Sequence, residues 1–302
     1  DRFLSAGHSA AALRAMSYKS PISKFKDTTN GIEYYQNIRE MEEHFDEKKE
    51  EIISGLKALS ELLFRKGNVM ISYTASREGL AVLEEEIGSL KEALYPERMP
   101  ESRCILHCEK KNEGFKTSSK VQFAAKAGNF IDAGEEYNGA LQILKVIMSY
   151  EYLWINIRVK GGAYGCMSNF NRIGEGYFVS YRDPNLGRTL EIYDGVPEYL
   201  ENFTVSERDM TKYIIGTISG IDQPLEPAAL GDRSFHAYQS GVTVEMIQKE
   251  RNQVLDATEE TIRSLAGYIE TMMDAGTVCA IGNDRKLEEE KELFKQVSSL
   301  TQ

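Results

Sequence analysis

A cation and a phenol stand six positions apart in the segment NIRVKGGAYGC, which occupies residues 156–166. Arg158 stays protonated and carries a planar fork of N–H donors, and Tyr164 carries an O–H donor on a rigid ring. Gly161 and Gly162 lie between them, and a glycine pair favours a sharp turn between two regular elements. A structural explanation is also open, because a cation in the last turn of a helix is favoured by the helix dipole alone.

Other groups that carry chemistry are less well placed. The segment CILHC at 104–108 holds two cysteines and a histidine, but no second pair of ligands follows it, so a short apolar strand is the preferred interpretation over a zinc site. Glu135 and Glu136 are typical of the start of a helix, and His236 is typical of a packed or surface histidine. The sequence GGAYG lacks the spacing of a phosphate-binding loop.

Composition limits the class of protein. The chain has 302 residues, 41% of them apolar and 27% charged, with a formal net charge of −11. Such a charge disfavours nucleic acid as a partner, and no apolar run is long enough to cross a bilayer, so we predict no nucleic-acid and no membrane partner. Four cysteines do not make a disulfide framework, which favours a reducing compartment: the cytoplasm, or an organelle matrix in a eukaryotic source.

The periodicity of the first third predicts two amphipathic helices around one strand. Apolar residues recur at helical spacing over 33–66, and Gly67 and Asn68 follow as a C-terminal cap. A β-rich run at 69–74 predicts a strand, and a second helix is expected over 76–94. The segment YPERMPES at 95–102 breaks all periodicity and is the expected domain boundary.

The remainder predicts an α+β domain. Strands are expected at 103–108 and 119–126, then a buried apolar helix of about 20 residues from Tyr137 to Arg158, then a hairpin of 163–170 with 176–183. Further helices are expected, followed by a strand at 277–282 and a last helix over 284–297; the helices cover 187–202, 206–220, 228–240, 243–254 and 258–274. We therefore predict an antiparallel sheet layered with helices.

An internal echo suggests repeated domains. The order helix, glycine, strand, polar turn and acidic helix describes both 35–94 and 243–297. If the repeat is real, the chain holds the end of one copy, residues 1–98, and one complete copy, residues 99–302. Since the sequence also begins without methionine, we expect it to be a fragment of a longer protein.

Three segments carry a resemblance to a known family. RVKGGAYG at 158–165, KYIIGTISGIDQPLEP at 212–227 and KVQFAAKAGNF at 120–130 resemble the C-terminal part of the insulinase-family (pitrilysin, inverted-zincin) metallopeptidases, in the branch of presequence proteases and falcilysin. GIEYYQNIREMEEHFDEKKEEI at 31–52 extends the resemblance over nearly the whole chain. RVKGGAYG is the most specific of these segments.

The resemblance implies a peptidase whose zinc lies outside this chain. Family members are built from four α+β domains in two bowls that close over a peptide, with zinc held by H-x-x-E-H in the first domain. None of the histidines here begins that motif; they are His8, His44, His107 and His236. The chain would then be the end of the third domain and all of the fourth. No cofactor is expected on it, and its partners would be the zinc-bearing N-terminal half and a peptide substrate.

The resemblance also assigns roles to the Arg–Tyr pair. Arg158 and Tyr164 match the family's catalytic arginine and tyrosine in type and spacing, so they are expected to bind the backbone of the substrate and the oxygen on which charge develops. Gly161 and Gly162 join them as expected substrate-binding positions. A non-catalytic homologue that binds peptides or scaffolds a complex is the alternative, and a helical interaction module is a weaker one.

Overall fold

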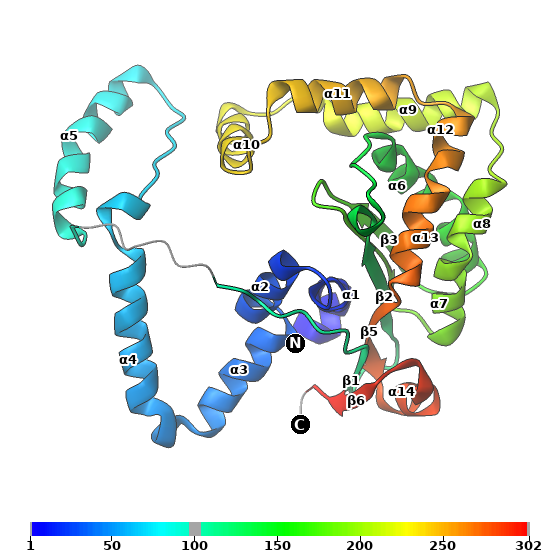
Figure 1. The fold of residues 1–302 in the computed structure, drawn as a ribbon, viewed down its shortest axis with the longest axis horizontal. Helices are drawn as coiled ribbons and strands as arrows, with labels where there is room; N and C mark the ends of the chain where they lie inside the picture. Colours follow the sequence, from blue (N-terminus) through cyan, green and yellow to red (C-terminus); the bar gives the residue numbers. More distant parts are fainter. Residues whose placement is uncertain (1, 97–103, 301–302) are drawn as a thin grey trace. The chain divides into compact units, whose positions relative to one another are not determined.

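The computed structural model of the protein describes residues 2–96 and 104–300 (Figure 1). Contacts divide the chain into two units: unit 1 comprises Asp1–Tyr35, Ile105–Asp222 and Gln248–Gln302, and unit 2 comprises Gln36–Cys104 and Gln223–Ile247. The domain boundary expected from the sequence falls mostly on 97–103, outside the described residues. The division into repeats at residue 98 therefore stays a prediction.

Unit 1 is built on one mixed sheet of six strands in the order β3-β4-β2-β5-β1-β6. The strands are β1 (Glu113–Thr117), β2 (Phe123–Asn129), β3 (Gly165–Phe170), β4 (Glu175–Tyr181), β5 (Thr277–Asn283) and β6 (Gln296–Ser299). The pairs β3–β4, β4–β2 and β2–β5 are antiparallel, as predicted. The pairs β1–β5 and β1–β6 are parallel, so the sheet is not wholly antiparallel.

Helices cover both faces of this sheet (Figure 1). One face packs against helices α6 (Ala140–Tyr150), α7 (Gly187–Asp194), α8 (Val196–Glu201) and α13 (Ala266–Asp274). The other face packs against α1 (Arg2–Ser17), whose small residues Ala11 and Ala15 are fully buried. Strand residues alternate between the two cores: Phe178 faces the first and Val179 faces the second. The α+β prediction is confirmed.

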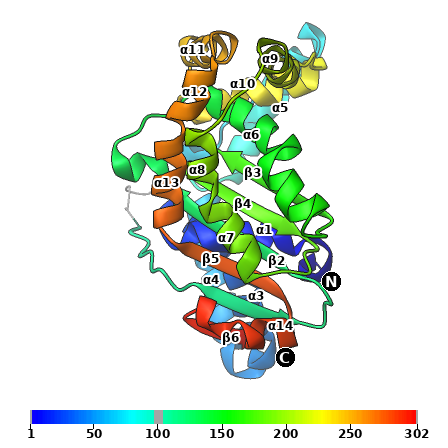
Figure 2. The same ribbon diagram turned by 90° about the vertical axis from the view of Figure 1, so that its right-hand side faces the viewer.

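Several of the remaining helices of unit 1 lie close to the residue ranges that the sequence predicts for them. The remaining helices are α2 (Pro21–Asn30), α9 (Glu207–Ile221), most of α11 (Val244–Leu255), α12 (Glu259–Ser264), α14 (Asp284–Glu289) and the short turns η2 (Phe130–Ala133), η3 (Trp154–Val159) and η4 (Lys291–Leu293). The Ser206 side chain caps α9 by accepting the backbone N–H of Asp209 at 3.1 Å. Figure 2 shows α7, α8 and α13 along the same side of the sheet.

Several expectations on the strands and helices of unit 1 were wrong. Residues 104–112 form no strand, and β2 begins at Phe123, four residues later than expected. The helix expected over 284–297 ends at Glu289, and the chain returns to the sheet as β6. β6 was missed because Gln296–Ser299 is short and polar, and its partner β1 lies far away in the sequence.

Unit 2 consists of helices whose apolar faces remain exposed. It contains most of α3 (Ile32–Glu43), with α4 (Phe45–Leu63), η1 (Lys66–Asn68), α5 (Arg77–Ala93) and α10 (Pro227–Gln239). The predicted helix over 33–66 is thus broken between α3 and α4 at His44. Neither α4 nor α5 has a buried residue. The strand expected at 69–74 does not form, so the structure gives no support at this point to the internal echo.

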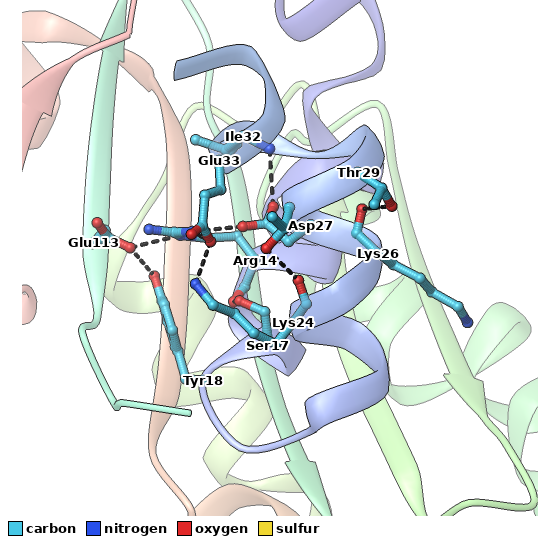
Figure 3. A network of polar contacts seen from close by, with 11 residues as sticks. Arg14, Ser17, Tyr18, Lys24, Lys26, Asp27, Thr29, Ile32, Glu33 and Glu113 are labelled. Atoms are coloured by element: carbon cyan, nitrogen blue, oxygen red, sulfur yellow. Dashed lines mark hydrogen bonds and ion pairs between the residues drawn. The ribbon is translucent and has the colours of Figure 1, made fainter. Parts of the chain in front are cut away.

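A buried ionic network ties α1 and α2 to the sheet (Figure 3). Arg14 donates to Glu113 at 2.7 Å and to Asp27 at 2.5 Å, and Tyr18 donates to the same Glu113 oxygen at 2.9 Å. Asp27 also accepts the backbone N–H of Ile32, at the start of α3. Because Arg14 and Asp27 are almost completely buried, their charges are tolerable only through this mutual pairing.

Within the described residues, no helix is both long enough and apolar enough to span a membrane.

Candidate substrate-contact site

Arg158 lies in η3, a wide helical turn. The N–H of Lys160 donates to the carbonyl of Ile155, five residues earlier, at 2.9 Å. The sequence predicted one continuous helix from Tyr137 to Arg158, but α6 ends at Tyr150 because Glu151 leaves the helical conformation (φ −108°, ψ −108°). Wide turns of this kind are often found at functional sites. Arg158 is exposed at the end of the turn.

Each glycine after η3 is required for a different reason. Gly162 has φ +82°, a left-handed conformation that other residues adopt only with strain. At Gly161 a Cβ atom would lie 2.4 Å from the carbonyl oxygen of Ile157, so no side chain fits there. The predicted sharp turn between Arg158 and Tyr164 therefore exists, and it depends on both positions.

The turn brings the two predicted side chains together. The guanidinium carbon of Arg158 lies 5.8 Å from the centre of the Tyr164 ring and 4.2 Å from the centre of the Trp154 ring. Among the described residues, Arg158 has neither an ion pair nor a hydrogen bond through its side chain. Its N–H donors are therefore available to a ligand.

Tyr164 immediately precedes β3 and is 65% exposed. Its backbone N–H donates to the carbonyl of Tyr181 at 3.1 Å, and its ring meets the Tyr181 ring edge to face at 5.7 Å. Tyr181 in turn contacts His8 of α1, with ring centres 4.9 Å apart. A line of rings thus runs from the Arg158 side chain onto the sheet. Tyr181 contacts Tyr164 through both its backbone and its ring, while the Tyr164 side chain stays largely exposed.

A polar chain fixes the glycine turn from behind. The side-chain amide of Asn185 donates to the Gly161 carbonyl at 2.7 Å, and the Asn185 backbone N–H donates to Asp183 at 2.8 Å. Asp183 also accepts the hydroxyl of Thr189 at 2.7 Å. Burial raises the pKa of the Asp183 carboxyl above its ordinary value, and these hydrogen bonds offset part of that effect.

The site offers donors but no nucleophile. Cys166 follows two residues after Tyr164, and burial raises the pKa of its thiol to about 12, so it stays protonated at neutral pH. Two surface cavities, of about 690 and 490 Å³, lie elsewhere, and neither is lined by Arg158 or Tyr164. The pair sits on an exposed surface of unit 1.

The residues that the structure describes offer no ligand set for a metal ion. Among the residues that the structure describes, no group of three or more His, Cys, Asp or Glu side chains could hold a metal ion. Cys104 is exposed and Cys108 partly exposed, and both are free thiols. Glu136 forms a surface contact with Lys249 at 3.9 Å, and its backbone carbonyl accepts the Tyr268 hydroxyl at 3.1 Å. The ring of His236 lies 6.2 Å from that of its neighbour Phe235.

Sequence reasoning found the pair but missed its supports. Trp154 stands four residues before Arg158, a spacing that places two side chains on one helical face, so this contact had a signal. Tyr181 and Asn185 had none, because only the pairing of β3 with β4 and the return of the chain after β4 bring them to the turn.

Comparison with known proteins places these residues in a family. Residues 112–284 match the family described as "PreP C-terminal domain". The chain belongs to the PreP C-terminal domain family. The matched segment contains η3, both glycines, Tyr164 and every strand except β6. The resemblance to presequence proteases, which was inferred from RVKGGAYG and its companions, is confirmed.

Named relatives of this family member are much longer than the chain. "Protein HypA" of Clostridium perfringens is 40% identical over 294 residues, which cover 97% of this chain and 30% of that protein. "Presequence protease 1, chloroplastic/mitochondrial" of Arabidopsis thaliana is 30% identical over 287 residues, or 94% of this chain and 26% of that protein. The chain thus spans less than a third of either relative.

Solved structures similar to this family member include the peptidase M16 inactive domain from Pseudomonas fluorescens. The TM-score is 0.47 at 16% identity, over 69% of this chain and 51% of that one. At that level the likeness carries no functional argument.

Proposed function

We propose that this chain is the non-zinc, C-terminal part of a zinc-dependent oligopeptidase that encloses and hydrolyses short unfolded peptides. The observation that carries the proposal is the Arg158–Tyr164 pair, which the turn at Gly161 and Gly162 brings together with its donors exposed. Membership of a family whose named relatives include presequence proteases supports it.

In this proposal each residue of the pair has one task. The guanidinium of Arg158 donates N–H bonds to backbone carbonyls of the bound peptide and orients it. The hydroxyl of Tyr164 donates to the scissile carbonyl oxygen as that oxygen gains negative charge, which stabilises the transition state more than the bound substrate. Gly161 and Gly162 keep side chains away from the peptide. Zinc, held by the N-terminal half, would activate the attacking water.

In this proposal the Arg158–Tyr164 pair is only part of an active site, so the chain needs a partner that carries the zinc. We infer that the partner is the zinc-bearing N-terminal half of the same polypeptide, and that closure of that half over this surface would exclude water and complete the site. We predict no nucleic-acid and no membrane partner. The cytoplasm, or an organelle matrix in a eukaryote, stays the predicted compartment.

One simple observation distinguishes the proposed peptidase from the alternative, a non-catalytic homologue. A non-catalytic homologue that binds peptides or acts as a scaffold would use the same surface without zinc. The reading frame upstream of Asp1 decides: an H-x-x-E-H motif in it favours the peptidase, and a frame that extends through the N-terminal half without that motif favours the homologue.

Metal analysis and a peptidase assay on this chain alone test whether the zinc site lies outside it. We expect residues 1–302, purified alone, to bind no stoichiometric zinc and to cleave no peptide. One tightly held zinc per chain would contradict the proposal directly, because it would place the metal on this part of the protein.

A further inference from the structure

The guanidinium of Arg158 is held without the use of its donors. Its carbon lies 4.2 Å from the centre of the Trp154 ring, and no carboxylate or carbonyl of the described residues accepts from it. An aromatic face attracts a guanidinium through the flat side of the group, whereas hydrogen bonds are donated in its plane. A ring can therefore fix the plane of an arginine while every N–H stays free.

Two other arginines of unit 1 are fixed in the opposite way. Arg172 donates two bonds of 2.6 Å to Glu250, and Arg251 donates to both carboxylate oxygens of Asp222. These carboxylates occupy the fork that a substrate carbonyl would need. Arg158 differs from them because it has a rigid support and an unoccupied fork.

We propose that Trp154 is the positioning residue for Arg158: its indole face holds the guanidinium in the orientation in which the fork meets the backbone of a bound peptide. This inference rests on the proposed function. A free arginine side chain has several rotatable bonds, and ordering it on binding weakens affinity. Stacking on Trp154 orders the group before the peptide arrives. The Tyr164 ring is a second, more distant aromatic contact, at 5.8 Å.

The backbone of η3 supports this role. Trp154 and Arg158 lie four residues apart in the wide turn, so the ring and the guanidinium share one face. Trp154 is half-buried and packs against the main core of unit 1, which gives the ring a fixed position, while Arg158 is exposed. The core thus fixes the Trp154 ring, and this ring supports the exposed guanidinium of Arg158.

Kinetics of the full-length protein that contains this chain test the proposal, with a short unstructured fluorogenic peptide as substrate. We expect Trp154→Leu to raise KM by about two- to fivefold, the scale of an exposed cation–π contact, with kcat nearly unchanged. Trp154→Phe, which keeps an aromatic face, should restore most of the loss. A purely structural role would instead lower the apparent kcat, through fewer folded molecules, and leave KM as it was.

A double-mutant cycle separates positioning from general packing. In an Arg158→Ala background, Trp154→Leu should change KM no further, because the group it positions is gone. The same two- to fivefold loss in that background would overturn the inference. If Arg158→Ala alone left turnover and KM unchanged, the proposed function would fail; if Arg158→Ala were defective and Trp154→Leu behaved like wild type, only the positioning role would fail.

Fluorescence tests the contact without any activity. Trp154 is the single tryptophan of the chain, so the emission of residues 1–302 reports on this ring alone. We expect Arg158→Ala to change the emission and to increase quenching by acrylamide. Arg182→Ala is the matched control, since Arg182 lies 5.4 Å from the Tyr181 ring and is exposed like Arg158. Identical emission and quenching in the two variants and the unmodified chain would overturn the inference.

Discussion

The two units use the same kind of amphipathic helix with different results. In unit 1, helices such as α6 bury most of their apolar side chains, among them Leu144 and Ile147, against a sheet that is covered on both faces. In unit 2, α4 and α5 also have apolar residues at helical spacing, but neither helix buries a residue. Leu56 of α4, for example, is 61% exposed. The comparison teaches that a periodic pattern determines where a helix forms, whereas its burial depends on a partner elsewhere in the chain.

The largest expected effect concerns the ionic network of unit 1. Replacement of Arg14 by Met should destabilise the fold by about 3–5 kcal/mol, because Asp27 and Glu113 would remain as buried carboxylates without their cation. Denaturant unfolding measures the change. Arg285→Met is the control, since Arg285 forms an exposed pair with Glu289 and should cost less than about 0.5 kcal/mol. Equal costs would mean that the network does not stabilise unit 1.

A matched pair of leucines sharpens the comparison itself. Leu144→Ala in unit 1 should cost about 2–5 kcal/mol, because it leaves a cavity in a fully buried core. Leu56→Ala in unit 2 should change the free energy of unfolding by no more than about 0.5 kcal/mol in residues 1–302. Urea titration of both variants gives the values. A similar loss at the two positions would show that unit 2 has a core of its own.

The smallest effect is a pH dependence at His8. Burial lowers the pKa of His8 below its ordinary value of 6.5, so the folded state binds a proton less readily than the unfolded chain does. The sign follows: stability is full above about pH 6.5 and falls as the pH drops from there through the folded pKa. His8→Phe should remove this part of the acid sensitivity while the ring contact with Tyr181 is kept. An unchanged pH profile in that variant would rule His8 out as its source.

Much of unit 1 could be predicted from its sequence, because its signals are local. The hairpin β3–β4 was expected from two strand-like runs joined by the turn NRIGE at 171–175. In the structure Gly174 of that turn has φ +85°. The helices between residues 187 and 274 were also expected from the sequence. β6 could not be expected, since a short polar strand forms only where a distant partner, here β1, offers an edge.

In unit 2 the error was the opposite one, because a strand was predicted where none forms. Residues 69–74 have the composition of a strand, but a strand requires a neighbour, and no described segment pairs with them. For the candidate site, residue types and spacing predicted the Arg158–Tyr164 contact across the glycine turn. The supports from Tyr181 and Asn185 could not be predicted, because they lie beside the turn only after the sheet has formed.

One measurement tests the central claim most directly: the kcat of Tyr164→Phe and of Arg158→Ala in the full-length protein that contains this chain. Tyr164→Phe should lower kcat by about 10²-fold, the scale for loss of one donor to a developing oxyanion. Arg158→Ala should lower kcat by a similar factor of about 10², because the peptide is no longer oriented for reaction. Circular dichroism should show no change in folding for either variant. Tyr150→Phe, at an exposed tyrosine that does not contact the pair, should keep normal turnover. Wild-type turnover in both Tyr164→Phe and Arg158→Ala would contradict the account and leave the pair with a structural role alone.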